Sequence, residues 1–372
     1  MLPISNLRSN PLCDTIEHTF YPVKRAAGPG DTVLMARRSA RRRPSSSAPL
    51  TLPAELPVGP VPISTGTAEV VRDPDFPQRV TLHVNGVPSS SLDLADPGFL
   101  DFEYMQQMAA FVALLPPGPL RVLHLGAAGS AFARHVEHER PGSRQLGVDL
   151  DPRLLELVRE WFALPRSPLL RLRADDAGRA LASARDASYD VVVRDVFAGD
   201  RTPAHLVGTG FAAEAHRVLR PGGILLVNCA DRPPLTTARR EVASLAEAFG
   251  PGAAAQGRLA AVAEPAILKG RRYGNLVLAA VREVPEDGPG DDVGGADPGD
   301  ARDDDPRATQ KGAQDGPQAP GQAGSDVGQP DLRDARLGRA LRALAVPATL
   351  LAGDDAAAFA GTAAPLETAA PA

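Results

Sequence analysis

The stretch QLGVDLDPRLLELVREWF, residues 145–162, joins a short apolar run directly to a helical pattern. Residues 145–150 read as a buried strand, and Pro152 suits the first turn of a helix because its missing amide needs no partner there. The leucines and the valine that follow recur at helical spacing, which gives the helix one apolar face. A strand followed at once by an amphipathic helix is the unit from which helix-covered parallel sheets are built.

The same alternation continues along the chain. Strand candidates occupy residues 121–126, 145–150, 169–175, 189–197, 223–230, 259–265 and 273–281. Helical segments separate the first five of these runs, whereas no helix separates the last two, which predicts an antiparallel finish. The chain is therefore predicted to be an α/β protein with a Rossmann-like, seven-stranded and mostly parallel sheet whose last strand is antiparallel.

A second, smaller β unit is predicted upstream of this sheet. Asn85-Gly86 lies between alternating runs, and this pair favours a hairpin because a type I′ turn needs positive φ at both central positions. Apolar residues at helical spacing over 102–115 then indicate a helix, which two prolines end. We expect a small β-hairpin domain over residues 63–98 and the Rossmann-like domain over residues 99–283.

Composition divides the rest of the chain into tails and an insertion. Residues 1–62 include five arginines between positions 37 and 43, followed by Ser and Pro, and are predicted to be a disordered basic segment. Residues 284–330 are acidic and rich in Gly and Pro, so they bury too little apolar surface to order themselves and are predicted to be a disordered linker or insertion. Residues 331–372 are predicted to form a helical segment that packs back on the body through a stripe of leucines: Leu332, Leu337, Leu341 and Leu344.

The overall charge and the cysteine content argue against several classes of protein. A formal net charge of −5 argues against a general nucleic-acid binder, and no specific nucleic-acid partner is predicted. Cys13 and Cys229 are too few for a disulfide framework, which favours a reducing, cytoplasmic location. No apolar run reaches the length of a membrane span, so no membrane partner is predicted, and no Cys/His/carboxylate spacing indicates a metal site. The sequence leaves a homodimer open.

Candidate ligand-binding residues lie at the carboxyl ends of the predicted strands, where open parallel sheets bind their ligands. The first strand ends in HLGAAGS, in which Gly126 and Gly129 allow a tight turn close to a ligand and Ser130 can cap the next helix. The second strand ends at Asp149, a position where a carboxylate commonly accepts from ribose hydroxyls, while Asp151 is the predicted helix cap.

The third predicted strand ends in Asp175 and Asp176. Either carboxylate can accept from an adenine amino group or cap the following short helix, and the sequence does not choose between these roles. Acidic ends on successive strands, after a glycine turn at the first, together predict an adenosine-type pocket. A fourth predicted strand, in YDVVVRDVFAGDRTPAH at 189–205, leads into Asp195. Burying a carboxylate at the end of a core strand costs free energy, so Asp195 is a candidate functional residue.

Residues 65–283 resemble the spermidine synthase (polyamine aminopropyltransferase) family, in particular its actinobacterial spermidine-synthase-like branch. The likeness rests on VLHLG, GVDLDP, DDAGRAL, YDVVVRDVFAGDRTPAHL and VLRPGGILLVN, and on the hairpin that is followed by FEY. It implies the class I S-adenosylmethionine-dependent methyltransferase fold, with decarboxylated S-adenosylmethionine or S-adenosylmethionine as co-substrate and no metal.

The resemblance also implies roles for individual residues. Asp149 is then the ribose ligand, and Asp176 with Ala177 holds the adenine side of the pocket. Tyr104 and Asp200 become the residues that bind a small-molecule amine substrate.

By the same resemblance Asp195 is the catalytic acid–base residue, and the chemistry fits. An aliphatic amine has a pKa near ~10, so it must lose a proton before it attacks carbon. A carboxylate at a strand end can hold the ammonium and then take its proton. Attack on the methylene beside a sulfonium displaces a neutral thioether, so no oxyanion hole or metal is needed.

We therefore expect transfer of an aminopropyl group to an amine, as in polyamine biosynthesis. Two alternatives stay open. One is an S-adenosylmethionine-dependent methyltransferase on the same fold, and the other is a non-catalytic member that binds a nucleoside or a protein partner. Fold likeness alone does not choose among them.

Overall fold

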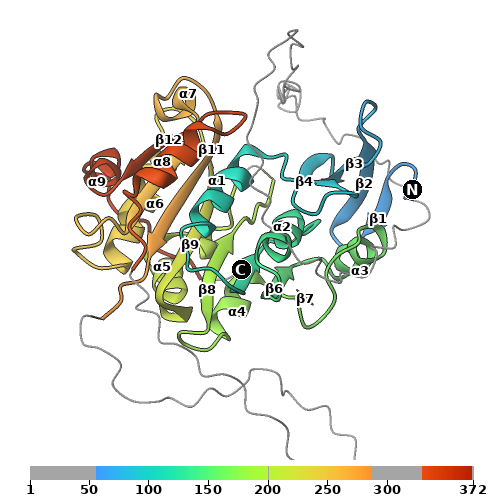
Figure 1. The fold of residues 1–372 in the computed structure, drawn as a ribbon, viewed down its shortest axis with the longest axis horizontal. Coiled ribbons are helices and arrows are strands. Elements are labelled where there is room, and N and C mark those ends of the chain that lie inside the picture. The colour runs from blue at the N-terminus through green and yellow to red at the C-terminus, as the bar shows by residue number, and fades with distance from the viewer. Residues whose placement is uncertain (1–55, 200, 286–328, 371–372) are drawn as a thin grey trace, which may run out of the picture. The chain divides into compact units, whose positions relative to one another are not determined.

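The computed structural model describes residues 56–199, 201–285 and 329–370. The two segments predicted to be disordered lie almost entirely outside these ranges. Within them the chain forms two sheets, one of four strands and one of eight, together with the helices that cover the larger sheet (Figure 1). No helix in the described ranges is long and apolar enough to cross a membrane.

The larger sheet consists of β5 (Arg121–Leu125), β6 (Arg144–Asp149), β7 (Leu170–Ala174), β8 (Tyr189–Arg194), β9 (Leu219–Asp231), β10 (Leu259–Ala263), β11 (Gly274–Val281) and β12 (Thr349–Ala352). Their order across the sheet is β12-β10-β11-β9-β8-β5-β6-β7. The five strands from β5 to β9 run parallel, β11 pairs antiparallel with β9, and β10 pairs antiparallel with β11. The seven predicted strands and their antiparallel finish are confirmed, although the short helix α7 (Pro265–Leu268) separates the last two, where no helix was expected. The strand β12 adds an eighth strand beside β10.

Helices cover both faces of this sheet. One face carries α1 (Glu103–Val112), α2 (Ala131–Glu139), α3 (Pro152–Trp161) and α8 (Ala335–Arg342), and the other carries α4 (Ala177–Ala182), α5 (Gly208–Val218), α6 (Thr236–Ala248), α7 (Pro265–Leu268) and α9 (Asp354–Ala360). In β8, Val191 and Val193 pack into the first core, whereas Val192 points into the second. Burial on both faces explains why these strands read as continuous apolar runs.

The smaller sheet is antiparallel and consists of β1 (Val61–Ile63), β2 (Gly66–Arg72), β3 (Arg79–Val84) and β4 (Val87–Asp93). The predicted turn joins β3 to β4, with φ of 52° at Asn85 and 78° at Gly86. The hairpin is thus one half of a four-stranded sheet. Thr65 ties this sheet to the start of α3, because its amide and its hydroxyl both donate to Asp151 Oδ2, at 2.6 and 2.9 Å.

The carboxyl-terminal residues form more than the predicted helix. After α8 the chain adds β12, which pairs antiparallel with β10, and then α9, which packs on α6 (Figure 1, red). The predicted apolar stripe does face the core. Leu332, Leu337 and Leu341 are buried, and Leu344 packs partly buried against the same core.

Candidate active site

The switch point of the larger sheet lies between β5 and β8, because the chain order reverses there. Gly126 follows β5 and Asp195 follows β8, and the Asp195 amide donates to the Leu125 carbonyl at 2.8 Å. Gly126 has a φ of 89°, and a Cβ on it would lie 2.0 Å from the Asp195 carbonyl oxygen. Glycine is therefore required for the two strand ends to approach this closely.

The Asp195 carboxylate accepts hydrogen bonds from two other elements. The Tyr104 hydroxyl of α1 donates to Oδ2 at 2.8 Å, and the Asn228 amide of β9 donates to Oδ1 at 2.9 Å. Burial raises the pKa of Asp195 above its ordinary value, against the lowering effect of these two hydrogen bonds. Burial, and after it the charge of Asp195, also raises the pKa of Tyr104, so its hydroxyl stays protonated and donates. A carboxylate of raised proton affinity, held by two donors, is suited to act as a general base.

Asn228 is a site residue that the sequence analysis did not single out. Its Nδ2 faces Asp195, because an ionised carboxylate only accepts, and its Oδ1 therefore points elsewhere. This Oδ1 is buried and has no hydrogen-bond partner among the described residues. A buried acceptor without a partner destabilises the protein unless a ligand donor meets it. The sequence feature that could have identified Asn228 is its place as a polar residue inside the apolar run GILLVNCA.

Arg194 precedes Asp195 in the chain but points to the opposite face of the sheet. There it forms a bidentate ion pair with Glu241 of α6, at 2.6 and 2.9 Å. The same guanidinium donates to the carbonyl oxygens of Leu206 and Asn228, at 2.8 and 3.2 Å. Arg194 thus fixes the end of β8 against β9 and α6, and the Asp195 carboxylate is not part of that ion pair.

Asp149 ends β6 and is held by backbone amides. Ala128 donates to its Oδ2 at 3.0 Å, and Asp151 donates to its Oδ1 at 3.1 Å. Burial raises the pKa of Asp149, while these amides act to lower it. Leu150 beside it is 66% exposed, and this apolar surface next to an acceptor is a second feature that the sequence analysis did not single out. Asp151 caps α3 as predicted, because it accepts from the Leu154 amide at 2.8 Å.

Asp176, and not Asp175, caps α4. Its Oδ1 accepts from the Arg179 amide at 2.9 Å, and its Oδ2 lies 2.9 Å from His205 Nε2. Burial acts to raise the pKa of Asp176, but the contacts with Arg179 and His205 outweigh it and lower the pKa. Asp175 instead forms ion pairs with two arginines. Ala177 begins α4 and is buried.

The small sheet shapes the loop between β5 and α2. The Gly129 amide donates to Ser90 Oγ of β4 at 3.0 Å, and a Cβ on Gly129 would lie 2.7 Å from the Ser90 Cβ. The close approach of β4 therefore requires glycine here. The prediction that Ser130 caps α2 is wrong, because its φ is 58° and its hydroxyl donates back to the Ala127 carbonyl oxygen at 3.3 Å.

The remaining predicted site residues lie along one edge of the sheet or outside the described ranges. The structure brings Tyr104 and Asp195 into contact, and it places Asp149 and Asp176 after the neighbouring strands β6 and β7. Asp200 lies outside the described residues, so its role as an amine ligand stays a prediction. Among the residues that the structure describes, no group of three or more His, Cys, Asp and Glu side chains is arranged to hold a metal ion.

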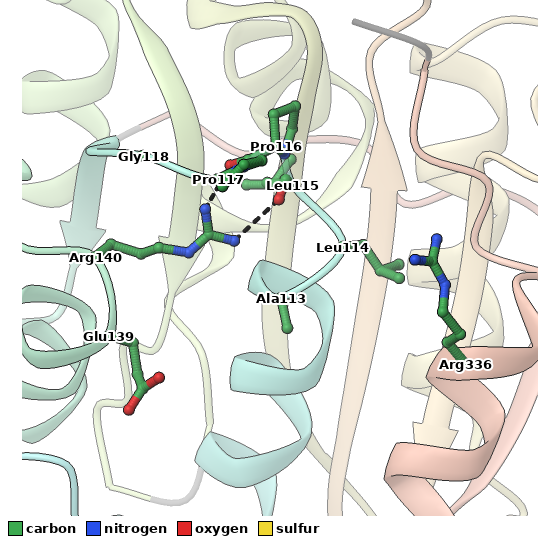
Figure 2. A pocket seen from close by; sticks show the side chains of 9 residues that line it. All are labelled: Ala113, Leu114, Leu115, Pro116, Pro117, Gly118, Glu139, Arg140 and Arg336. Atoms are coloured by element: carbon green, nitrogen blue, oxygen red, sulfur yellow. Dashed lines mark hydrogen bonds between the residues drawn. The ribbon is translucent and has the colours of Figure 1, made fainter. Parts of the chain in front are cut away.

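A cavity of about 410 Å³ lies elsewhere, at the carboxyl end of α1 (Figure 2). Arg140 beside it donates to the carbonyl oxygens of Pro116 and Leu115, at 2.5 and 3.0 Å, and Arg336 of α8 also lines it. Tyr104 lies in the first turn of α1, at the opposite end of the helix from this cavity. The candidate catalytic and ligand-binding residues therefore lie at the strand ends and not in this cavity.

Comparison with known proteins finds similarity to methyltransferases and to polyamine aminopropyltransferases. A family model described as a methyltransferase domain matches residues 123–227. The polyamine aminopropyltransferase of Chromobacterium violaceum is 28% identical over 139 residues, which is 37% of this chain and 53% of that protein. The eEF1A lysine and N-terminal methyltransferase of Xenopus laevis is 27% identical over 183 residues, which is 45% of this chain and 26% of that protein.

A solved structure of a bacterial protein matches most of the chain. The crystal structure of a probable spermidine synthase from Corynebacterium glutamicum is 29% identical, with a TM-score of 0.66, and covers 85% of this chain and 98% of that chain. This protein therefore has the class I methyltransferase fold. Within that class its fold is spermidine synthase-like. The chain spans about half the length of the curated aminopropyltransferases that it matches, and all of the curated relatives named here are transferases.

Proposed function

We propose that this chain transfers an aminopropyl group from decarboxylated S-adenosylmethionine to an amine, with Asp195 as the general base. The observation that carries the proposal is the arrangement of Tyr104, Asp195 and Asn228 at the end of β8. It combines a carboxylate of raised pKa, a protonated hydroxyl and a buried acceptor that lacks a partner among the described residues. An ammonium substrate needs acceptors of this kind and a base that can take its proton.

The amine arrives protonated, because an aliphatic amine has a pKa near ~10. Each Asp195 oxygen accepts one protein donor and keeps a second lone pair for the substrate, and Asn228 Oδ1 accepts another N–H. Because burial raises the proton affinity of Asp195, proton transfer to this carboxylate is easier than to an exposed aspartate.

The neutral nitrogen then attacks the methylene carbon beside the sulfonium. A C–N bond forms, and the C–S bond breaks with its electron pair moving to sulfur, so the leaving group is neutral methylthioadenosine. The leaving group needs no proton, so a single base is sufficient. The product departs as a secondary ammonium, and Asp195 returns its proton to solvent.

The neighbouring strand ends suit the adenosine part of the donor. Asp149 offers an acceptor for the ribose hydroxyls, and Leu150 offers exposed apolar surface for the base. Asp176 at the start of α4 offers an acceptor for the adenine amino group. These residues follow two adjacent strands, β6 and β7, so they support one continuous nucleoside site.

A methyltransferase that uses S-adenosylmethionine itself is the second candidate, and one observation favours it. Residues 126–130 contain no carboxylate to pair with the ammonium of an aminopropyl arm, whereas the arm of S-adenosylmethionine carries its own carboxylate beside its ammonium. The similarity to the Xenopus laevis methyltransferase agrees with this alternative.

The test is calorimetric titration of the full chain with decarboxylated S-adenosylmethionine, S-adenosylmethionine and methylthioadenosine, followed by product analysis with a panel of diamines. We expect tighter binding of the decarboxylated donor and a release of methylthioadenosine that depends on added amine. Tighter binding of S-adenosylmethionine together with a methylated product overturns the proposal in favour of the methyltransferase. Binding of methylthioadenosine without turnover of either donor identifies a non-catalytic nucleoside-binding protein.

A further inference from the structure

His205 joins two parts of the candidate site that are distant in the sequence. It lies in η1 (Ala204–Leu206), the short 3-10 helix that ends the loop after Asp195. Its Nε2 is 2.9 Å from Oδ2 of Asp176, the residue that caps α4. The side chains of His205 and Asp176 are only 16% and 25% exposed, so water competes weakly for this contact.

The contact is a hydrogen bond of defined polarity. An ionised carboxylate only accepts, so Nε2 of His205 carries the proton and donates. Asp176 Oδ1 already accepts from the Arg179 amide, which leaves Oδ2 as the oxygen that His205 holds. The terminal torsion of an aspartate is broad, so this second contact narrows the orientations that the carboxylate adopts.

The His205 ring is itself held in place. A Cβ on Gly178 would lie 3.0 Å from His205 Cδ2, so the ring packs against the first turn of α4 where a larger residue would press on it. The carbonyl that follows His205 accepts from Arg194 at 2.8 Å, and the Ala204 carbonyl before it accepts from the Ala369 amide at 3.3 Å. The sheet and the carboxyl-terminal residues therefore hold η1 on both sides of His205.

We propose that His205 is a positioning residue for nucleobase recognition, because it fixes the Asp176 carboxylate so that Oδ2 accepts from the 6-amino group of adenine. The inference rests on the proposed adenosine site. His205 takes one lone pair of Oδ2 and leaves the other for the ligand. A site built around a fixed acceptor rejects a base that lacks the matching donor, so His205 contributes mainly to base discrimination.

The experiment compares methylthioadenosine with methylthioinosine, which has a carbonyl oxygen in place of the 6-amino group. Both are titrated by calorimetry into the wild-type protein, His205→Ala and His205→Gln, with His138→Ala as the matched control because the His138 side chain on α2 is 44% exposed. We expect the wild type to prefer methylthioadenosine and His205→Ala to reduce that preference roughly tenfold, the effect of one lost hydrogen bond to a charged group. His205→Gln should restore most of it, since its amide nitrogen donates where Nε2 does.

The inference and the proposed function fail in different ways. An unchanged preference in His205→Ala overturns the inference, and so does an equal loss of affinity for both nucleosides with a lower thermal midpoint, which indicates a structural role. A wild-type protein that binds neither nucleoside overturns the adenosine site, and the inference with it. If His205→Ala loses the preference for methylthioadenosine but the wild-type protein turns over no amine, the inference about His205 is supported and only the proposed reaction is contradicted.

Discussion

The carboxylate of Asp195 receives hydrogen bonds from Tyr104 and Asn228, yet burial still raises its pKa. The ionised form, which a general base requires at neutral pH, is therefore the form that the fold disfavours. Perturbed carboxylates of this kind gather at functional sites, because the same burial that costs stability increases proton affinity.

Asp195→Asn should not destabilise the protein at neutral pH. A carboxyl group whose folded pKa is raised stabilises the fold below its unfolded pKa of about 3.9, and this contribution is lost as the pH rises through the folded pKa. Asparagine avoids that loss and keeps both contacts, since its oxygen accepts from Asn228 and its amide donates to the Tyr104 hydroxyl. Thermal unfolding at pH 7 should give a midpoint equal to or above that of the wild type. A clearly lower midpoint would identify Asp195 as a structural residue.

Asp149→Ala should weaken methylthioadenosine binding by about 1–3 kcal/mol, because the ribose hydroxyls lose their acceptor while their own donors stay buried. Asp186→Ala is the control, since it removes a carboxylate whose side chain is 75% exposed. Calorimetric titration of both variants measures the difference. Equal affinities for wild type and Asp149→Ala would contradict the ribose assignment.

The acidic residues of the site were predictable because each directly follows an apolar strand pattern, as Asp149 and Asp195 do. The contacts of Asn228 and His205 were not predictable, because their partners Asp195 and Asp176 lie 33 and 29 residues away in the chain. Only the sheet order brings these side chains together. The error at Ser130 is similar in kind, since a positive φ imposed by the loop turns its hydroxyl away from the helix amides.

Among the elements, α5 begins without a cap of its own, because Val207 before it has no side-chain acceptor. The carboxyl-terminal residues supply the missing partners. The Leu366 carbonyl accepts from the Thr209 amide at 2.9 Å, and Thr368 Oγ1 accepts from the Phe211 amide at 3.0 Å. Partners 157 residues away therefore satisfy amides that a local cap usually serves.

Thr368→Val should lower the free energy of unfolding by about 1 kcal/mol, the usual effect of losing a helix cap. Valine keeps the shape of threonine but removes both the acceptor for the α5 amide and the donor to the Val207 carbonyl. Thr362→Val, at an exposed position of the same segment, should have almost no effect. Denaturant unfolding of the two variants compares them, and equal losses would show that capping is not the role of Thr368.

Elements with a strong local pattern were predictable, as α3 shows with its proline and apolar face and β3–β4 shows with Asn85-Gly86. The strand β12 was not predictable, because it is four residues long and its partner β10 lies far upstream in the chain. Short edge strands of this kind are defined by tertiary pairing and not by their own propensity.

In the whole molecule, residues 331–372 complete the sheet through β12 and cover both of its faces, since α8 packs in one core and α9 in the other. Deleting them should strongly lower the midpoint of thermal unfolding. The size of the expected loss follows from the buried side chains of Leu337 and Leu341, because truncating one such leucine to Ala costs about 2–5 kcal/mol of folding free energy.

The matched deletion removes residues 286–328, whose acidic, Gly- and Pro-rich composition predicts little burial of apolar surface. The flanking residues already meet, because the Val284 amide donates to Gln329 Oε1 at 3.0 Å, so a short Gly-Ser linker can replace the segment. We expect the thermal midpoint to stay nearly unchanged. Similar losses in the two deletions would contradict this division of the chain.

We propose that the carboxylate of Asp195, at the end of β8, is the base in the alkylation of an amine. The most direct measurement compares Asp195→Asn with the wild type in two assays: affinity for methylthioadenosine, and release of methylthioadenosine from decarboxylated S-adenosylmethionine and a diamine. We predict that nucleoside affinity is retained while kcat falls roughly 10²–10⁴-fold, the usual range for a positioned general base. Retained turnover, or a joint loss of nucleoside affinity and stability, would contradict the claim.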